Sequence, residues 1–424
     1  MRTVTLTEHS TSDPFPLDGA ARERLLDLVP GRLEVQATAD PGQVRLRSTS
    51  WVGAVHVPGL TVRVTPRAAM ANLFTMFSAG IPGGTLGREE VGWEGGVDLV
   101  DGVAAFLLRA IDDCTRRGLL HGYLHREESL HVIRGRLLVE QVAVRPWAAA
   151  RPPCGYDDFT VDVPENRMLR CALEQLLRWP ALPPVLRRGA TALAVRFDGV
   201  SPTVPDDHRG GVPITRLNEH YAAALDLAGQ ALEGVTISHR EGEHRAHAFL
   251  IDLQDVFQRW VAAELQARLW PMLHVSERPA YSLDDDARLP VRPDLVVMRG
   301  DRPALVLQAR HRLVGASSAL SQEVSALLLQ AASLPVPTAL LVYADAEHPP
   351  EPQMRIRGTG TRLLCLPLTL DATPDALSAR LDEIAELVRV FGARPAAETE
   401  PGAGERRRTH DLMTDRRRCG DGSQ

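Results

Sequence analysis

The sequence predicts an α+β protein in which a β-rich N-terminal region and a helical middle precede a smaller α/β domain with a mixed sheet. Three observations support this fold class. The first hundred residues alternate apolar and polar side chains between Pro-Gly turns. Stretches with helical periodicity dominate the middle of the chain. The last third alternates amphipathic helices with short apolar strands.

Length and composition set the broad class of the protein. The chain has 424 residues, enough for two or three domains, and its 44% hydrophobic and 24% charged residues are typical of a soluble globular protein. The net charge of −6 argues against a uniformly basic nucleic-acid coat, although a local basic face is compatible with it. All 48 basic residues are arginine, which excludes a Walker-type phosphate loop and a catalytic lysine.

Cysteine usage and apolar runs indicate a cytoplasmic location. The odd cysteine count, the wide spacing and the lack of a C-x-x-C pair argue against a zinc ribbon or a disulfide framework, so reduced thiols are expected. The N-terminal stretch has no apolar core of a signal peptide, and no run is long enough to span a membrane. The cysteines are Cys114, Cys154, Cys171, Cys365 and Cys419.

Residues 1–240 are expected to form the first domain, with a β-rich part at 1–95 and a mixed helical part at 96–240. Short strands should run through the alternating segment that ends at Arg67. The polar segment "EGVTISHREGEHR" indicates the domain boundary. Between these points the sequence predicts a short helix at 71–80, a glycine-rich loop at 83–96, a helix at 98–117, a β-like piece at 130–147, and helices at 163–180 and 214–232.

Residues 246–392 are expected to form the second domain. The order of helix, strand pair, helix and strand is that of a small α/β domain. The polar, charged segment 393–424 should be disordered. The predicted elements are a long amphipathic helix at 248–271, strands at 293–300, 303–310, 338–345 and 361–370, and helices at 317–334 and 375–392.

The stretch "RPDLVVMRGDRPALVLQAR", residues 292–310, has the outline of a metal-dependent nuclease core. Such a core has an acid at the start of one strand, a turn, and a second strand that ends in acid-x-Lys. Asp294 supplies the first acid, but the second strand ends in Gln308-Ala309-Arg310. The motif is therefore recognisable while most of its chemistry has changed.

Four longer segments carry a family resemblance. They are "WVGAVHVPGLTVRVTPR", "RRGLLHGYLHREESLHVIRGRLLVEQ", "CGYDDFTVDVPENRMLRCALEQLL" and "RLNEHYAAALDLA". In order and spacing the chain resembles McrC, the non-motor subunit of McrBC-type modification-dependent restriction systems, from about residue 30 to 392. The resemblance implies an AAA+ partner hexamer of the McrB type, a GTPase or ATPase, which the N-terminal region contacts and stimulates. It also implies a C-terminal PD-(D/E)XK nuclease domain that cuts DNA.

The resemblance assigns the vestigial nuclease positions to Gln258, Asp294, Gln308 and Arg310. In the family the helix acid stands where this chain has Gln258, and a further glutamine aligns near Ala326. Replacing carboxylates by neutral amides weakens binding of Mg²⁺, which prefers anionic oxygen ligands. Arg310 cannot lose a proton near neutral pH and is expected to pair with Asp294. No cofactor is expected, except Mg²⁺ at Asp294 if the nuclease were active.

Other candidate residues have both a functional and a structural interpretation. His239, His244 and His247 are compatible with a metal site, but a solvated linker is the preferred interpretation. Asp284, Asp285 and Asp286 form either a loop acid for the nuclease site or a solvated turn. The candidates for contact with the motor are Arg116, Arg117, Arg134, Arg136 and Arg167.

The preferred hypothesis is a regulatory McrC-like subunit that stimulates an AAA+ motor and reaches DNA through the complex, with an inactive nuclease site. One alternative is an active Mg²⁺-dependent endonuclease with an unusual D…Q-x-R site. Another is an adaptor or DNA-binding protein with neither catalytic nor stimulatory activity.

Overall fold

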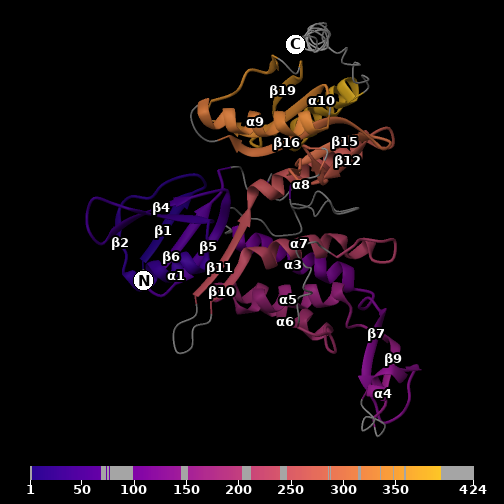
Figure 1. The fold of residues 1–424 in the computed structure, drawn as a ribbon. Helices are drawn as coiled ribbons and strands as arrows, with labels where there is room; N and C mark the ends of the chain where they lie inside the picture. Colours follow the sequence, from indigo (N-terminus) through magenta and orange to yellow (C-terminus); the bar gives the residue numbers. More distant parts are fainter. Residues whose placement is uncertain are drawn as a thin grey trace, which may run out of the picture.

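The computed structural model describes residues 2–67, 73, 76, 99–144, 151–202, 212–238, 246–284, 286, 288–313, 317–334, 336–346, 348–357 and 360–392 (Figure 1). Three expectations fall largely outside these ranges: the helix at 71–80, the loop at 83–96 and the tail at 393–424. Of the first, Leu73 and Met76 are described, and both are helical and buried.

Two small sheets form the N-terminal region, as the alternating pattern predicts. In β4, Val44, Leu46 and Ser48 are buried and the residues between them are not, because successive side chains of a strand point to opposite faces. The five-stranded sheet has the order β1 (Arg2–Thr7), β6 (Leu60–Thr65), β5 (Trp51–Val57), β11 (Ala246–Asp252) and β10 (Val235–Ser238). The three-stranded sheet contains β2 (Phe15–Pro16), β4 (Gln43–Ser48) and β3 (Leu33–Ala37), and helix α1 (Gly19–Leu28) precedes β3.

Strand β11 belongs to the N-terminal sheet, and this corrects the predicted domain organisation. Leu250 pairs with Gly53, and Asp252 pairs with Trp51. The boundary expected between residues 240 and 246 is therefore wrong, because the polar stretch lies between two paired strands, β10 and β11. The helix expected from residue 248 begins instead at Leu253, since the apolar run before it is buried as a strand.

A layer of helices packs beside the five-stranded sheet (Figure 1). Helix α3 (Leu99–Thr115) matches its prediction, and α5 (Pro164–Arg178) begins at a proline that suits a first helical turn. Helix α6 (Pro184–Arg196) was not predicted. Helix α7 (Ala222–Gly234) begins eight residues later than expected, after the 3-10 turn η3 (Glu219–Tyr221). The delay arises because the Asn218 side chain accepts a hydrogen bond from the backbone of Thr215 at 2.6 Å and closes a turn there.

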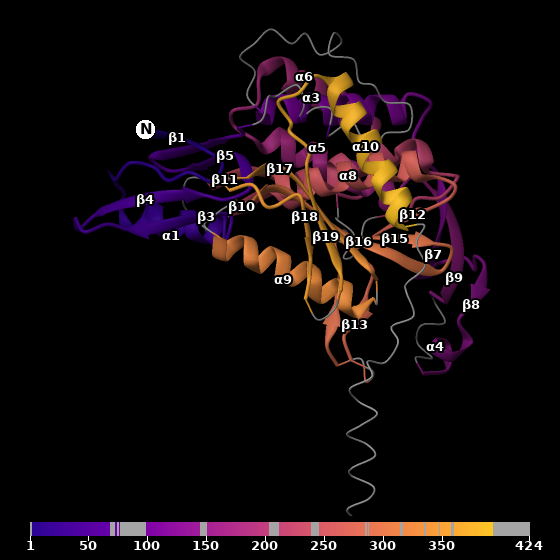
Figure 2. The same cartoon turned by 90° about the horizontal axis from the view of Figure 1, so that it is seen from above.

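Residues 122–160, here called the β-arm, project from the helical layer (Figures 1 and 2). The arm consists of β7 (Gly122–Ser129), β8 (Arg136–Leu137), α4 (Val139–Val144) and β9 (Pro153–Thr160), with β9 between β7 and β8. The β-like piece expected at 130–147 is thus a strand only at β8, and α4 follows it. The longer strands of the arm, β7 and β9, come before and after residues 130–147 in the sequence.

The C-terminal part has the predicted mixed sheet. Its order is β12 (His274–Glu277), β15 (Leu295–Arg299), β16 (Arg302–Leu313), β17 (Thr338–Ala346), β19 (Arg362–Pro367) and β18 (Gln353–Arg355). Strands β16, β17 and β19 run parallel, whereas β15 pairs antiparallel with β16. Helices α8 (Leu253–Leu269) and α10 (Pro374–Gly392) cover one face, and α9 (Ser317–Ser333) covers the other (Figure 2). A short hairpin, β13 (Tyr281–Ser282) and β14 (Pro290–Val291), stands apart from this sheet.

One continuous hydrophobic core joins the two parts of the chain. It extends from Leu6 in the first strand to Val388 in the last helix, and Phe257 and Trp260 of α8 lie within it. The four described cysteines are free and buried. Within the described ranges, no helix has the length and apolar character needed to cross a membrane.

Gly53 provides a test of how β11 docks on β5. Its φ is +134°, and a Cβ at this position would collide with the backbone oxygen of Phe249 in β11. We expect Gly53→Ala to lower the free energy of unfolding by about 3 kcal/mol, because both the dihedral and the strand spacing must change. Chemical denaturation provides the measurement.

Gly59 is the matched control for this substitution. It also has a positive φ, +82°, but a Cβ there meets no atom within 4 Å. Gly59→Ala should therefore cost only about 1 kcal/mol, the strain of the left-handed conformation alone. Equal losses for the two variants would contradict the tight approach of β11 to β5.

Candidate functional site

The strand pair β15 and β16 brings together three of the four predicted nuclease positions. Gln308 and Arg310 are two residues apart on β16, so their side chains leave the same face of the sheet. Leu295 pairs with Leu307, and continuing this antiparallel register places Asp294 opposite Gln308. The fourth position, Gln258, lies on α8 one helical turn after Gln254, which binds β16.

Arg310 forms an ion-pair bridge at the centre of this site. Its Nη1 donates to Asp294 Oδ2 at 2.7 Å, and its Nε donates to Glu323 Oε2 at 2.8 Å. The Arg310 and Asp294 side chains are only 20% and 19% exposed, so solvent screens the pair less than it would screen a surface pair. The predicted pairing of Arg310 with Asp294 is confirmed.

Glu323 of helix α9 was not among the predicted site residues. An arginine in the lysine position has five N–H donors, more than one carboxylate can accept. The sequence could have indicated a second acid near Arg310 on this ground. Ala326, which the sequence placed near the family's helix glutamine, is exposed one turn further along α9. The acid thus comes from the helix behind the strand pair.

The two glutamines of the site are buried and incompletely hydrogen-bonded. Gln308 is 1% exposed and Gln258 is 4% exposed. Within the described part of the chain, Gln308 Oε1 and Gln258 Nε2 find no hydrogen-bond partner. A carboxylate in either place would be a buried charge, which is far more costly than a buried amide unless a cation compensates it. Neutral side chains at these positions therefore suit a site without a metal ion.

The donor set does not fit a hard divalent cation. Such ions need several oxygen ligands, preferably anionic, and the two carboxylates near β16 already bind one guanidinium. Among the described residues, no group of three or more histidine, cysteine, aspartate or glutamate side chains is placed to hold a metal. Arg310, Asp294 and Glu323 thus form an ion-pair network of their own.

Helix α8 and the N-terminal sheet hold β16 in place around the site. Gln254 of α8 donates to the carbonyl of Ala309 at 2.7 Å and accepts from the backbone of His311 at 2.9 Å. His311 Nδ1 lies 3.4 Å from Glu8 Oε2 just after β1, and both side chains are buried. Burial lowers the pKa of His311 to about 4, so its ring is neutral at physiological pH.

The aspartates before β15 serve a turn. Asp284 accepts from Ser282 Oγ at 2.7 Å and from the backbone of Leu289 at 2.8 Å, and these bonds, the serine first, lower its pKa. Asp286 pairs with exposed Arg288 at 2.9 Å. Their interpretation as a solvated turn is therefore confirmed for the two that are described, and Asp285 lies outside the described residues.

Of the three histidines His239, His244 and His247, the structure describes only His247. His247 is buried in β11, where its backbone pairs with that of His56. His239 and His244 lie outside the described residues.

The five candidate arginines do not form one cluster. Arg116 pairs with Asp113 at 2.6 Å beyond the end of α3, and neighbouring Arg117 is exposed. Arg134 and Arg136 lie on the β-arm, and Arg134 donates to Asp158 at 2.8 Å with its guanidinium 4.1 Å from the centre of the Tyr156 ring.

Arg167, the remaining candidate for contact with the motor, is bound within the chain at the end of β9. It forms two hydrogen bonds with Asp162, both of 2.8 Å. Asp162 also accepts from the backbone and the hydroxyl of Ser201. This bidentate pair with a nearly buried carboxylate is a strong, directional contact, so Arg167 fastens the root of the β-arm to the helical layer.

The β-arm carries an unusual number of exposed apolar side chains. Tyr123 is 74% exposed and Phe159 is 59% exposed, and their ring centroids are 5.0 Å apart across the strand pair. His121 stacks on Phe159 at 5.2 Å. The other exposed apolar residues of the arm are Val132, Ile133, Val139 and Val144. Such a projecting surface indicates a protein interface, and only the structure brings its residues together.

The pair between Arg167 and Asp162 predicts a pH dependence of stability. The guanidinium holds the pKa of Asp162 well below its usual value of 3.8. Because the folded-state pKa is depressed, the stabilisation is present at neutral pH and is lost as the pH falls below that value. We expect Asp162→Asn to cost about 2 kcal/mol at pH 7 and progressively less at lower pH.

Urea denaturation from pH 7 down to pH 3 measures this difference. Asp113→Asn, which alters an exposed pair of Arg116, is the matched control and should change stability by less than about 0.5 kcal/mol. A penalty for Asp162→Asn that does not vary with pH would contradict the ion pair as its cause.

One family model matches most of this chain. The model of the family described as "McrBC 5-methylcytosine restriction system component" matches residues 46–326. No curated protein matches the chain.

Two solved structures resemble the fold. The first is a half-complex from a tetradecameric assembly of Thermococcus gammatolerans McrB AAA+ hexamers with bound McrC. It has 15% sequence identity and a TM-score of 0.50, and the match covers 91% of this chain and 100% of that chain. The second is the Thermococcus gammatolerans McrBC complex, with 17% identity, a TM-score of 0.39, and coverage of 63% of this chain and 88% of that chain.

Proposed function

Because this chain belongs to the McrBC 5-methylcytosine restriction system component family, we propose that it is an McrC-type regulatory subunit with an inactive nuclease site. Its partner is an AAA+ hexamer of the McrB type, a GTPase or ATPase whose nucleotide hydrolysis it stimulates. DNA reaches the protein through that complex. The solved relative in which McrC is bound to McrB hexamers supports the choice of partner through its fold.

The observation that carries the inactive-site proposal is the bridge from Arg310 to Asp294 and Glu323. In a PD-(D/E)XK nuclease the bound metal supplies an activated water and neutralises charge on the phosphate. Here the permanent charge of one guanidinium is shared by two carboxylates and offsets one of their two negative charges, and Arg310 cannot act as a proton acceptor. This chain's own residues can hold the strands and α9 together, but they offer no base and no open ligand set.

The β-arm is the surface that we assign to the motor. Its exposed aromatic and aliphatic side chains are accessible, and Arg134 and Arg136 lie on the same projection. The two hydrogen bonds of Arg167 with Asp162 fix the base of the arm to α5. An arm that is rigid at its base and apolar on its surface suits a contact that must bias the conformation of a partner.

The first functional prediction concerns metal and DNA cleavage. We expect calorimetric titration with Mg²⁺ or Mn²⁺ to detect no stoichiometric site, because both available carboxylates are already bound to the Arg310 guanidinium. Asp294→Ala should leave stimulation of the motor within about twofold, or ~0.5 kcal/mol, since this side chain lies far from the β-arm.

Two results would favour an active nuclease instead. One is a divalent-cation site that disappears in Asp294→Ala. The other is DNA cleavage by the complex that the same substitution abolishes. Asp301→Ala, at the turn between β15 and β16, is a suitable control because it removes an acid of the same strand pair at the end opposite the ion-pair network.

The second functional prediction concerns the β-arm. The double variant Tyr123→Ser and Phe159→Ser should reduce stimulation of nucleotide hydrolysis by about tenfold or more, since removing exposed aromatic anchors from an interface typically costs over 1 kcal/mol. The measurement is nucleotide turnover by the purified AAA+ partner as the concentration of this subunit is raised.

Val195→Ser is the matched control, because Val195 is 73% exposed on α6 in the body of the protein. It should leave turnover unchanged. If the arm variant stimulates like the wild type, the arm is not the motor contact. If the wild-type protein binds the motor and never changes its turnover, the adaptor alternative replaces the regulator.

A further inference from the structure

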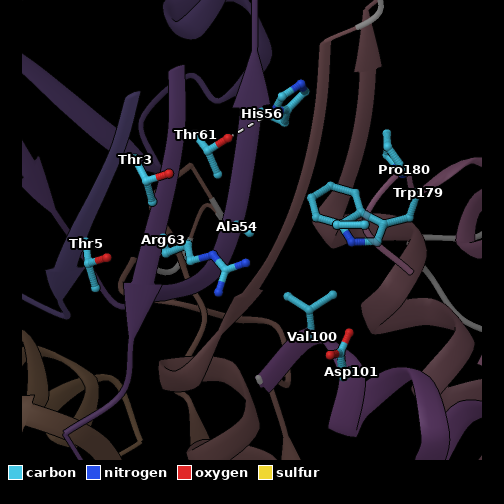
Figure 3. Close-up of a pocket in the computed structure, with 11 residues that line it drawn as sticks. Thr3, Thr5, Ala54, His56, Thr61, Arg63, Val100, Asp101, Trp179 and Pro180 are labelled. Atoms are coloured by element: carbon cyan, nitrogen blue, oxygen red, sulfur yellow. Dashed lines mark hydrogen bonds between the residues drawn. The ribbon is translucent and has the colours of Figure 1, made fainter. Parts of the chain in front are cut away.

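A cleft of about 590 Å³ lies between the five-stranded sheet and the start of α3 (Figure 3). Strand register forms polar rows across its sheet wall, Thr3 with Thr61 and His56, and Thr5 with Arg63. Figure 3 shows Arg63 and Asp101 among the lining residues, and both already interact within the protein. Among the described lining residues no free charge remains for a ligand, so unused bonding capacity has to be sought elsewhere.

The β-arm has a strand edge that no other described strand occupies. Strand β9 lies in the middle of the arm's sheet, so β7 pairs on one side only, and its other side is here called the free edge. Its eight residues pair with β9 in continuous register, from Gly122 opposite Thr160 to Ser129 opposite Pro153. Within the described ranges, β7 is the longest strand at the edge of any sheet.

The hydrogen bonds around β9 show which backbone groups of β7 point toward the free edge. Leu130 donates to the carbonyl of Pro152 at 3.2 Å, and on the other side of β9 Leu138 donates to the carbonyl of Pro153 at 2.9 Å. Bonded residues alternate along an antiparallel ladder, so the even-numbered residues of β7 bond to β9 and the odd-numbered residues face away. The outward N–H and C=O groups are those of Tyr123, His125, Glu127 and Ser129.

This edge is long, straight and accessible. Edge strands are commonly kept short, bulged or interrupted by proline, because their unpaired backbone groups are a template for another strand. The edge strands of the C-terminal sheet, β12 and β18, have only four and three residues. In contrast, β7 has no proline and no glycine after Gly122, and the arm that carries it projects from the helical layer (Figures 1 and 2).

The side chains along the free edge specify the segment that fits beside it. Tyr123 is exposed and packs on Phe159, so an apolar or aromatic side chain of an added strand would extend this pair. Toward the other end, Glu127 and Asp157 are exposed carboxylates, and a basic side chain suits that position. The same carboxylates disfavour a nucleic-acid strand, because they repel its phosphates.

We propose that an extended segment of the AAA+ motor adds to the free edge of β7 as a further strand. This inference rests on the proposed function, because it states how the β-arm holds the partner assigned to it there. The backbone of the segment bonds to the N–H and C=O groups of Tyr123, His125 and Glu127. Backbone bonds give such a contact its affinity, and the side chains at alternate positions give it specificity.

Residue-resolved hydrogen exchange of the full-length protein, with and without the purified AAA+ motor, tests this pairing. In the free protein the outward amides of Tyr123, His125 and Glu127 face solvent and exchange fast. The motor should slow their exchange at least about tenfold, because strand addition turns each of them into a hydrogen-bond donor. The amides of Leu124 and Arg126 bond to β9 in both states and are the internal reference.

A proline at position 125 tests the same pairing through binding. His125→Pro removes one outward N–H and no donor to β9, a position at which an edge strand tolerates proline. His125→Ala is the matched reference, because it removes the same side chain and keeps the N–H. The proline variant should bind the motor at least about tenfold more weakly than the alanine variant, a difference of about 1.4 kcal/mol. Should a melting curve show that His125→Pro unfolds the arm, Glu127→Pro and Glu127→Ala repeat the comparison at the next outward residue.

Two outcomes would overturn the strand addition while leaving the proposed function intact. One is a complex that stimulates nucleotide hydrolysis although the outward amides of β7 exchange as in the free protein. The other is equal binding by the proline and alanine variants.

Other partners would also overturn it. Protection of the same amides by a deoxyadenosine oligonucleotide would assign the edge to nucleic acid, and protection that rises with protein concentration alone would assign it to a second copy of this chain. A wild-type protein that never binds the motor would overturn both this inference and the proposed function.

Discussion

The architecture depends on the junction at Asp252, where a strand of the N-terminal sheet turns directly into a helix of the C-terminal part. The Asp252 carboxylate accepts from the backbone of Gln254 at 3.0 Å, which caps α8, and from Ser50 Oγ at 2.7 Å, which ties the cap to the chain just before β5. Burial raises the pKa of this carboxyl, while both hydrogen bonds favour its charged form. With no linker between β11 and α8, the two parts cannot reorient without breaking the cap, and they share one core. Gln254 of α8 in turn binds the backbone of β16, so this junction connects the N-terminal sheet to the strands of the C-terminal part.

The site on β15 and β16 is organised around one partly buried cation and two acids. Two carboxylates near the ends of β15 and α9 need a cation for electrostatic reasons, whether that cation is a metal or a side chain. Arg310 provides the charge permanently and connects the strand to the helix. The side chains of Gln258 and Gln308 are neutral amides. They add no further negative charge beside the two carboxylates that share the single guanidinium. The strand pair and α9 are thus connected by side chains of the protein itself.

Two surfaces of this protein have side chains that are unusual for their surroundings. The β-arm combines apolar side chains in solvent with a tightly hydrogen-bonded root, a combination that suits a rigid docking element. The sheet face of Thr3, Thr61 and Arg63 shows the reverse arrangement, polar groups on a face that ordinary packing would make apolar. Both deviate from the usual distribution of side chains. On the arm the deviation indicates an interface, whereas Arg63 in the cleft already interacts within the chain.

The sequence alone determined most of the secondary structure and the identity of the changed nuclease positions. Alternation and helical periodicity are local properties, so β4, α3, α5, the strand pair around Asp294 and the closing helix could be predicted from a few neighbouring residues. Arg310 was likewise predicted to pair with Asp294, because both lie in one short motif. The apolar run before Leu253 could not be assigned in the same way, since a buried strand and a buried helix share that composition, and only pairing with β5 decides between them. Glu323, the Asp162 anchor, the aromatic pair on the β-arm and the polar rows of the cleft all join residues distant in sequence. These were decided by tertiary structure, because strand register and helix packing bring such side chains within reach, and no local pattern records either.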